Sequence, residues 1–245
     1  MIRGLSFETA TTINIAFVVL VLALFENELW EIRTRLAKPV EFFFGNQYAT
    51  NSRIIDFIKD EHPKEAKLIE YSSGKVENVI DSLIREQCKV YLLLHSPTDG
   101  SINIRQEERI CNQIVTHMYS DFMGGDIGYR NIRIRCYKSP GSIRGRNIDN
   151  KLINLGWYTY NKKTPGVPFD IWGHTNPHLT IKEDCIDFPE VKDWFNKIFS
   201  ELWGDSQGLD TICEHCSKSH QFSLCKTSQF HDWIELVSKD DYHKA

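Results

Sequence analysis

From residue 66 onward the chain alternates between short apolar runs and longer stretches whose apolar positions have helical spacing. Residues 90–94 (VYLLL) are apolar without a break, which is typical of a strand buried on both faces of a parallel sheet. Residues 131–137 (NIRIRCY) alternate between polar and apolar positions, which predicts a strand with one buried face. Residues 188–203 carry apolar side chains three and four positions apart, which predicts an amphipathic helix.

The predicted elements between residues 66 and 203 follow the order β-α-β-α-β-β-β-β-α. They are strands at 66–71, at 90–94, at 131–137, on both sides of Asp149-Asn150, and at 169–172 or 179–181, and helices at 76–85, 104–122 and 188–203. A short strand at 40–44 and a short helix at 52–59 precede them. Strands linked through helices pair in parallel, whereas strands linked by tight turns pair antiparallel. This order predicts an α/β sandwich built around a mixed sheet.

One apolar segment near the N-terminus is long enough to cross a membrane. Residues 15–25 (IAFVVLVLALF) form an uninterrupted apolar run of eleven, and the window extended back to Phe7 has 19 residues with one charge, Glu8. A helix of that length spans about 28 Å, close to the roughly 30 Å of a hydrocarbon core. A buried core helix is the alternative interpretation of so short a run.

The residues after this run favour the membrane interpretation. Trp30 is an interfacial residue type, and Arg33, Arg35 and Lys38 follow it. Because these positive charges outnumber the single Arg3 before the run, we expect a single-pass anchor in the inner or plasma membrane with the bulk of the chain in the cytoplasm.

Composition and charge narrow the function classes. The 245 residues include 41% hydrophobic and 25% charged side chains, which excludes wholesale disorder. Twenty-nine basic and 33 acidic residues give a net charge of −4, so there is no overall positive field to attract nucleic acid. Seven cysteines, an odd number, favour a reducing compartment with a metal site over a disulfide framework.

The stretch from residue 142 to residue 156 carries the most chemical information. It begins Ser142-Ile-Arg144-Gly-Arg146-Asn-Ile-Asp149, and Gly156 follows seven positions after the aspartate. This register resembles the motif of the phospholipase D superfamily, which is His-x-Lys, four residues, Asp, six residues, and Gly-Ser-x-Asn. Ser142 stands at the histidine position and Arg144 at the lysine position, while Asp149 and Gly156 match the motif.

The resemblance implies a phosphate site without its usual nucleophile. In the family the motif histidine attacks the phosphorus, and the lysine and asparagine hold the non-bridging oxygens. Arg144 and Arg146 suit phosphate because a guanidinium offers a bidentate fork with a fixed charge. We therefore expect a module that binds a nucleotide, a nucleic acid or a lipid headgroup, or that senses or scaffolds. In the alternative interpretation both arginines are outward strand residues paired with acids, and Asp149-Asn150 is only a hairpin turn.

Other residues join the expected site. Asp149 belongs to the motif, and Tyr158 lies on the strand after it. Residues 173–178 (GHTNPH) place two histidines in one turn, and we expect His174 to cover the same cleft, although an ordinary polar loop fits equally. The predicted ligand-binding set is Arg144, Arg146, Asp149, Tyr158 and His174.

Two further hypotheses come from other function classes. A divergent phosphodiesterase or nuclease would use Ser142 or His95 as its nucleophile. His95 directly follows a predicted parallel strand, where α/β folds place ligand crevices, but it also fits a satisfied histidine at a strand end. A scaffold protein is the third class, because family members with one half-motif pair into homodimers to build a full site.

The C-terminal region contains a cluster of metal-ligand residue types. Its spacing, C-x2-C-x3-H-x4-C, resembles a zinc knuckle and supplies four ligands suited to tetrahedral zinc. The predicted ligands of this structural zinc ion are Cys213, Cys216, His220 and Cys225. Free thiols in a tail are the alternative.

These predictions divide the chain into four parts. They are an anchor helix with its continuation at 1–38, a linker at 39–64, a phospholipase D-like domain at 65–204 and a small zinc-binding appendage at 205–245.

Overall fold

The computed structural model describes residues 25–28, 41–43, 47–71, 76–96, 116–125, 127–138, 143–161, 170–172, 178–212 and 228–242. The chain divides into two compact units, residues 1–39 with 184–186, and residues 40–183 with 187–245. In the first unit, residues 25–28 are helical. The second unit contains an eight-stranded sheet.

The sheet is mixed, with strand order β1-β9-β6-β5-β2-β3-β4-β10. Its strands are β1 (Glu41–Phe43), β2 (Glu65–Glu70), β3 (Lys89–His95), β4 (Ile132–Tyr137), β5 (Ile143–Ile148), β6 (Leu152–Trp157), β9 (His178–Lys182) and β10 (Gln207–Gly208). Strands β2, β3 and β4 are parallel neighbours, and the other pairings are antiparallel. Strands β7 (Thr159–Asn161) and β8 (Asp170–Trp172) form a separate pair. The predicted mixed α/β architecture is confirmed.

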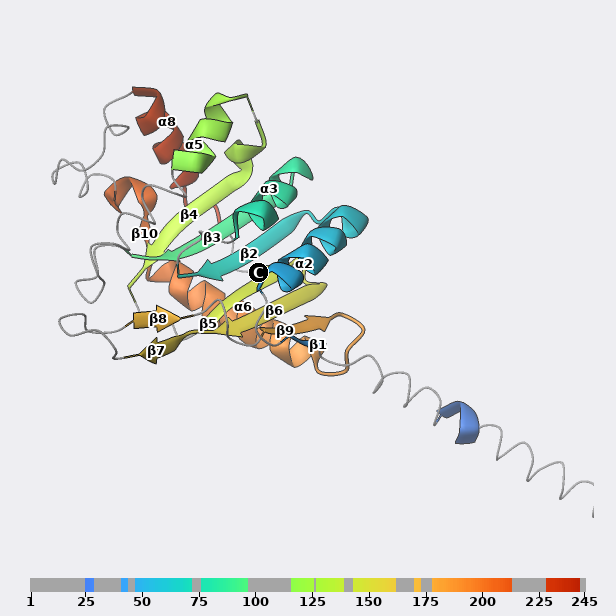
Figure 1. The fold of residues 1–245 in the computed structure, drawn as a ribbon. Coiled ribbons are helices and arrows are strands. Elements are labelled where there is room, and N and C mark those ends of the chain that lie inside the picture. The colour runs from blue at the N-terminus through green and yellow to red at the C-terminus, as the bar shows by residue number, and fades with distance from the viewer. Residues whose placement is uncertain are drawn as a thin grey trace, which may run out of the picture. The chain divides into compact units, whose positions relative to one another are not determined.

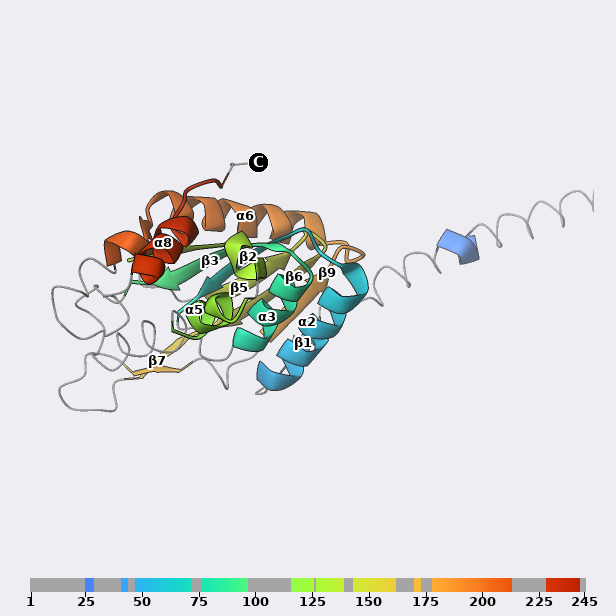
Figure 2. The same ribbon diagram turned by 90° about the horizontal axis from the view of Figure 1, so that it is seen from above.

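Helices cover both faces of the sheet. They are α2 (Gln47–Glu61), α3 (Glu77–Arg85), α5 (Thr116–Met123), the 3-10 helix η2 (Ile127–Asn131), α6 (Phe188–Gly204) and α8 (Ser228–Val237). Helices α2, α3 and α5 lie on one face, and α6 crosses the opposite face (Figures 1 and 2). We call these the α2 face and the α6 face.

The apolar core follows from strand alternation. Successive side chains of a strand point to opposite faces, so residues two apart share a face. On the α2 face the alternate positions of the three parallel strands join apolar side chains of α3 in one buried cluster, among them Ala66, Leu68, Leu92, Ile134, Val79 and Leu83. On the α6 face, Phe195 packs so closely that a Cβ on Gly145 would lie 2.6 Å from its Cε2 atom. Burial of both faces explains why residues 90–94 are apolar throughout.

The expected strands and the helix at 188–203 are confirmed, and both 170–172 and 178–182 are strands. Residues 39–64, however, are not a linker. Strand β1 joins the sheet through β9, and α2 is longer than the predicted helix at 52–59. Its Ile54 and Ile58 are fully buried in the core, because four-residue spacing places them on one side of the helix.

The C-terminal region also departs from the prediction of an appendage. Helix α8 lies at the β4 side of the sheet (Figure 1), and the segment 207–212 carries β10. Apolar side chains of both segments belong to the same core, namely Leu209, Ile212, Phe230, Trp233, Ile234 and Val237. The described part of residues 205–245 is therefore integral to the sheet domain.

Two predictions fall on parts of the chain outside the described residues. Residues 7–24 of the expected anchor lie outside them, and no helix among the described residues is long and apolar enough to cross a membrane. All four expected zinc ligands also lie outside them, and the described residues contain no metal-binding group of His, Cys, Asp and Glu. The anchor and the zinc site stay predictions.

Candidate anion-binding site

A row across three strands brings Arg144 and His178 together. Arg144 on β5 is opposite Gly156 on β6, and Gly156 is opposite His178 on β9. Since glycine has no side chain, the guanidinium and the imidazole meet over it, and Nη2 of Arg144 donates a hydrogen bond to Nε2 of His178. A Cβ at Gly156 would lie 2.6 Å from Nε of Arg144 and 3.0 Å from Cε1 of His178. The glycine of the motif register is therefore what permits this contact.

Arg146 lies two residues further along β5 on the same α2 face. Its Nε donates to Oε1 of Glu70 at 2.8 Å, and its Nη1 donates to Oδ1 of Asn51 at 2.7 Å. The side chains of Arg146 and Glu70 are 1% and 2% exposed, so this is a fully buried ion pair. Glu70 ends β2 and Asn51 lies on α2, so three elements meet at one guanidinium. The expectation of an arginine paired with an acid holds for Arg146, but the pair points inward.

Tyr158 lies against Arg144. The backbone N–H of Tyr71 donates to its phenol oxygen at 2.9 Å, and Cζ of Arg144 is 5.6 Å from the centre of its ring. Burial raises the pKa of Tyr158, with Glu70 adding to the effect, so the phenol is neutral at physiological pH. The structure thus brings together Arg144, Arg146 and Tyr158 of the predicted ligand-binding set.

The cluster has more positive than negative charge. Burial lowers the pKa of Arg144, and Glu70 opposes that change, but a guanidinium stays charged in proteins. Burial, followed by repulsion from Arg144 and Arg146, lowers the pKa of His178 to about 3, so its ring is neutral at pH 7. The guanidinium ions of Arg144 and Arg146 and the carboxylate of Glu70 together carry one more positive than negative charge.

Two buried N–H donors at this site have no acceptor among the described residues. One is Nη2 of Arg146, whose other guanidinium nitrogens bind Glu70 and Asn51. The other is Nδ1 of His178, which carries the ring proton because Nε2 accepts from Arg144. An unsatisfied buried donor costs roughly 1–3 kcal/mol. An anion with several acceptor oxygens would satisfy both donors and balance the charge.

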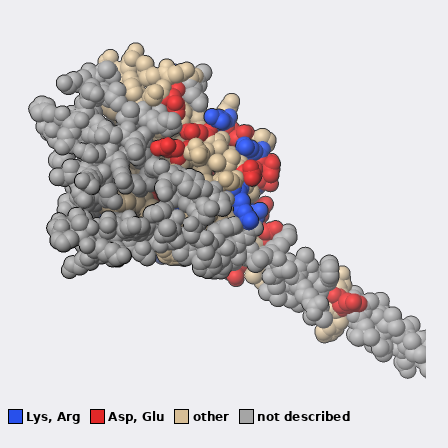
Figure 3. Space-filling model, viewed as in Figure 1, with Lys and Arg blue, Asp and Glu red and all other residues tan. Residues whose placement is uncertain are grey.

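The positive charge is inside the domain, because Arg144 and Arg146 are both buried. Over α2 and α3, Figure 3 shows Lys and Arg side by side with Asp and Glu. Along α2 the exposed charged residues include Arg53, Asp56, Lys59 and Glu61, which have both signs. This coloured part of the surface therefore has no single sign of charge, in line with the overall charge of −4.

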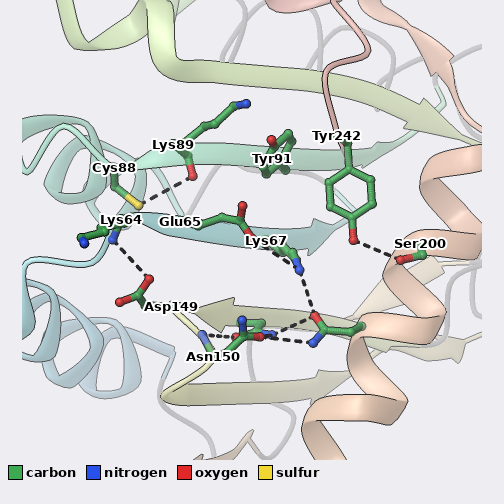
Figure 4. A network of polar contacts seen from close by, with 12 residues as sticks. Lys64, Glu65, Lys67, Cys88, Lys89, Tyr91, Asp149, Asn150, Ser200 and Tyr242 are labelled. Atoms are coloured by element: carbon green, nitrogen blue, oxygen red, sulfur yellow. Dashed lines mark hydrogen bonds and ion pairs between the residues drawn. The ribbon is translucent and has the colours of Figure 1, made fainter. Parts of the chain in front are cut away.

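Asp149, in contrast, does not join the cluster. Asp149 and Asn150 both have φ of 54° and form the two-residue turn between β5 and β6, which such positive φ values favour. The backbone N–H of Lys64 donates to Oδ1 of Asp149 at 3.3 Å (Figure 4). Lys64 precedes β2, whereas Glu70 ends it, so Asp149 lies at the opposite end of the sheet from Arg144. Its predicted place in the ligand site is corrected to a turn residue.

His95 lies on the other face. It shares the face of Tyr91, whose ring packs on Trp203 of α6 at 5.4 Å. The imidazole is buried between the rings of Tyr71 and Tyr137, at 4.8 Å and 5.2 Å. Ser142 and His174 lie outside the described residues. The hypothesis that Ser142 or His95 is a nucleophile stays a prediction, with His95 on the face opposite Arg144.

Sequence reasoning did not identify Glu70 and Asn51. Glu70 could have been noticed in the sequence, because an acid at the end of a largely apolar strand is unusual unless it is paired. Nothing in the sequence around Asn51 indicates its role, since its partner Arg146 is 95 residues away. His178 lies in the stretch 173–178 that was expected to cover the site, but it forms the first residue of β9.

No family model and no curated protein matches the chain. Its fold is similar, at a TM-score of 0.42 and 11% identity, to TrmBL2, an archaeal chromatin protein that binds DNA, with 82% of this chain and 67% of that chain covered. It is also similar to Nuc from Salmonella typhimurium, a phospholipase D family member, at a TM-score of 0.42 and 11% identity, with 69% of this chain and 97% of that chain covered. For a phosphatidylserine synthase from Haemophilus influenzae Rd KW20 the TM-score is 0.39 and the identity 13%, with 66% of this chain and 40% of that chain covered. Similarities this low assign neither a family nor an activity.

Replacing Gly156 by alanine is expected to break the contact of Arg144 with His178. The new Cβ would overlap the Arg144 side chain, and overpacking of this kind typically costs about 1–3 kcal/mol. Urea unfolding followed by tryptophan fluorescence measures the change. Gly124→Ala is the comparison, because its Cβ would lie 3.3 Å from the nearest atom, the backbone oxygen of Asp121, and not 2.6 Å as at Gly156, so a smaller change is expected. Equal stability of Gly156→Ala and the wild type would contradict the geometry.

Proposed function

We propose that this domain binds a phosphate-bearing ligand through Arg144, Arg146 and His178. The observation that carries the proposal is the buried cluster with an excess positive charge and two N–H donors that lack acceptors among the described residues. A phosphate group supplies negative charge and several acceptor oxygens at once, and charge-assisted hydrogen bonds to it are about twice as strong as neutral ones.

The sequence motif supports the same ligand chemistry. Arg144 stands at the position of the phospholipase D lysine, and Gly156 at that of the motif glycine. In the structure these two residues belong to one row across the sheet, with Gly156 making room for the guanidinium. Both the motif register and the position of its guanidinium beside His178 support a role for Arg144 in anion binding.

The ligand could be a nucleotide, a nucleic acid or a lipid headgroup, since all three present a phosphate. Titration calorimetry with the full chain distinguishes them. Its arms are inorganic phosphate, a mononucleotide, a single-stranded oligonucleotide, and vesicles with and without an anionic phospholipid. Heat with inorganic phosphate establishes the shared chemistry, and the arm with the highest affinity identifies the source.

Arg144→Gln is expected to weaken binding of whichever probe binds by about 100-fold or more, because two hydrogen bonds to a charged group are worth about 3 kcal/mol together. Glutamine preserves length and polarity but removes the charge. The matched control is Arg85→Gln, an exposed arginine in the last turn of α3, which should leave affinity unchanged. The proposal fails if no probe binds the wild type, or if both variants bind like it.

Three further properties are proposed from the sequence alone. Residues 7–25 anchor the chain in the inner or plasma membrane with the bulk of the chain cytoplasmic, Cys213, Cys216, His220 and Cys225 hold a structural zinc ion, and two copies pair as a homodimer. A chain anchored in this way would meet lipid headgroups, which makes the vesicle arm of the titration informative.

A further inference from the structure

His178 is held in one tautomer by its neighbour. A guanidinium has donors and no acceptor, so the contact between Nη2 of Arg144 and Nε2 of His178 requires an unprotonated Nε2. In a neutral ring the proton is then on Nδ1. His178 is 1% exposed, and its Nδ1 atom has no acceptor among the described residues.

Burial and two neighbouring guanidinium groups keep the ring of His178 neutral. Arg144 contacts it, Arg146 lies on the same face of β5, and both disfavour the imidazolium. Glu70 is bound to Arg146, and Tyr158 lies against Arg144. Burial, followed by repulsion from Arg144 and Arg146, lowers the pKa of His178 to about 3, so between pH 5 and pH 8 the Nδ1–H group is an uncharged donor that does not titrate.

We propose that the Nδ1–H group of His178 donates a hydrogen bond to a phosphate oxygen of the ligand, with Arg144 fixing the tautomer that makes this possible. The inference rests on the proposed function and adds a ligand contact that the phospholipase D register of residues 142–156 does not include. Arg144 then acts twice, since it binds the anion and orients a second donor.

Two substitutions at His178 separate its two nitrogens. In His178→Gln the side-chain carbonyl can reach the position of Nε2 and accept from Arg144, but the donor at Nδ1 is lost. In His178→Asn the amide nitrogen lies near the position of Nδ1, so a donor remains and the acceptor for Arg144 is lost. We expect His178→Gln to weaken binding of inorganic phosphate at pH 7 by about tenfold, the usual effect of one hydrogen bond to a charged group, and His178→Asn to weaken it less.

A spectroscopic measurement on the wild type does not depend on how well the variants fold. In the full chain labelled with ¹⁵N-histidine, nitrogen chemical shifts report the tautomer and the protonation state of His178. We expect the Nδ1–H tautomer with no titration between pH 5 and pH 8, and a downfield shift of the Nδ1 proton when inorganic phosphate is added.

The outcomes separate this inference from the proposed function. If phosphate binds but the Nδ1 proton does not shift, or if His178→Gln binds as tightly as the wild type, the His178 contact is wrong and the Arg144 site stands. An imidazolium at pH 7 also overturns it. If phosphate does not bind the wild type at all, the proposed function fails together with the inference.

Discussion

Glu70→Gln is expected to lower the free energy of unfolding by about 3–5 kcal/mol, the usual result of removing one partner of a buried ion pair. The substitution leaves Arg146 without its carboxylate, 2.8 Å from an amide that cannot balance the charge, and Arg144 loses the acid that opposes its desolvation. Urea unfolding of the full chain at pH 7 measures the change.

A matched control is Glu61→Gln. Glu61 also pairs with a cation at 2.8 Å, Lys151, but the two side chains are 40% and 35% exposed, and surface ion pairs contribute little. We expect only a small change in stability for this variant. Equal effects of the two substitutions would mean that burial of the Arg146–Glu70 pair does not matter.

The same variant links stability to the proposed ligand. Removing the negative charge of Glu70 raises the net charge of the cluster of Arg144, Arg146 and residue 70 from +1 to +2. Inorganic phosphate is therefore expected to stabilise Glu70→Gln more than the wild type, because a ligand that binds only the folded state stabilises it. Stabilisation no greater than that of the wild type would argue against an anion site next to Glu70.

Trp233→Ala is expected to destabilise the whole domain by about 3–5 kcal/mol, the usual cost of removing a large aromatic side chain from a core. Trp233 on α8 is buried, and its ring lies 5.7 Å from that of Tyr119, 6.2 Å from that of Phe230 and 6.4 Å from that of Phe122. Unfolding by urea, followed by circular dichroism, should remain a single transition.

Two further variants make this measurement specific to packing. Trp233→Phe keeps an aromatic ring in the same place and should cost less than Trp233→Ala. Gln229→Ala changes an exposed position on the same helix and should have little effect. If residues 205–245 formed an independent appendage, Trp233→Ala would leave the main transition in place and move only a separate one.

Residues 240–242 show why the C-terminal region belongs to the domain. Asp241 pairs with Arg133 of β4 at 2.9 Å and with Lys89 of β3 at 3.3 Å, and Asp240 accepts from the indole of Trp203 at 2.9 Å. Tyr242 packs on Trp203 at 5.5 Å and binds Ser200 on α6 (Figure 4). Asp241 thus neutralises cations on β3 and β4, and Asp240 and Tyr242 connect the C-terminal region to α6.

Local sequence pattern was enough to predict most of the sheet. The alternation in residues 131–137 and the unbroken apolar run of residues 90–94 reflect how many faces of each strand are buried, which is a property of each segment by itself. Asp149-Asn150 lies between two apolar segments and is a residue pair suited to positive φ, so the hairpin was also predictable. Arg144 and Gly156, two positions of the motif register, form a cross-strand pair, which the spacing of the motif alone did not predict.

Which residues form the site, and which charges are paired there, depends on the tertiary structure. Glu70 is 76 residues from Arg146 and Asn51 is 95 residues away, and no periodicity in either segment records such a pairing. The faces of the strands separate His95 from Arg144, although both lie near strand ends in the sequence. Local patterns were sufficient to predict the strands and the hairpin and to single out the arginines of one motif. The packing of α2, β2 and β9 around β5 is what buries these arginines, pairs Arg146 with a carboxylate and brings Arg144 into contact with a neutral histidine, because burial and long-range pairing are properties of the assembled fold.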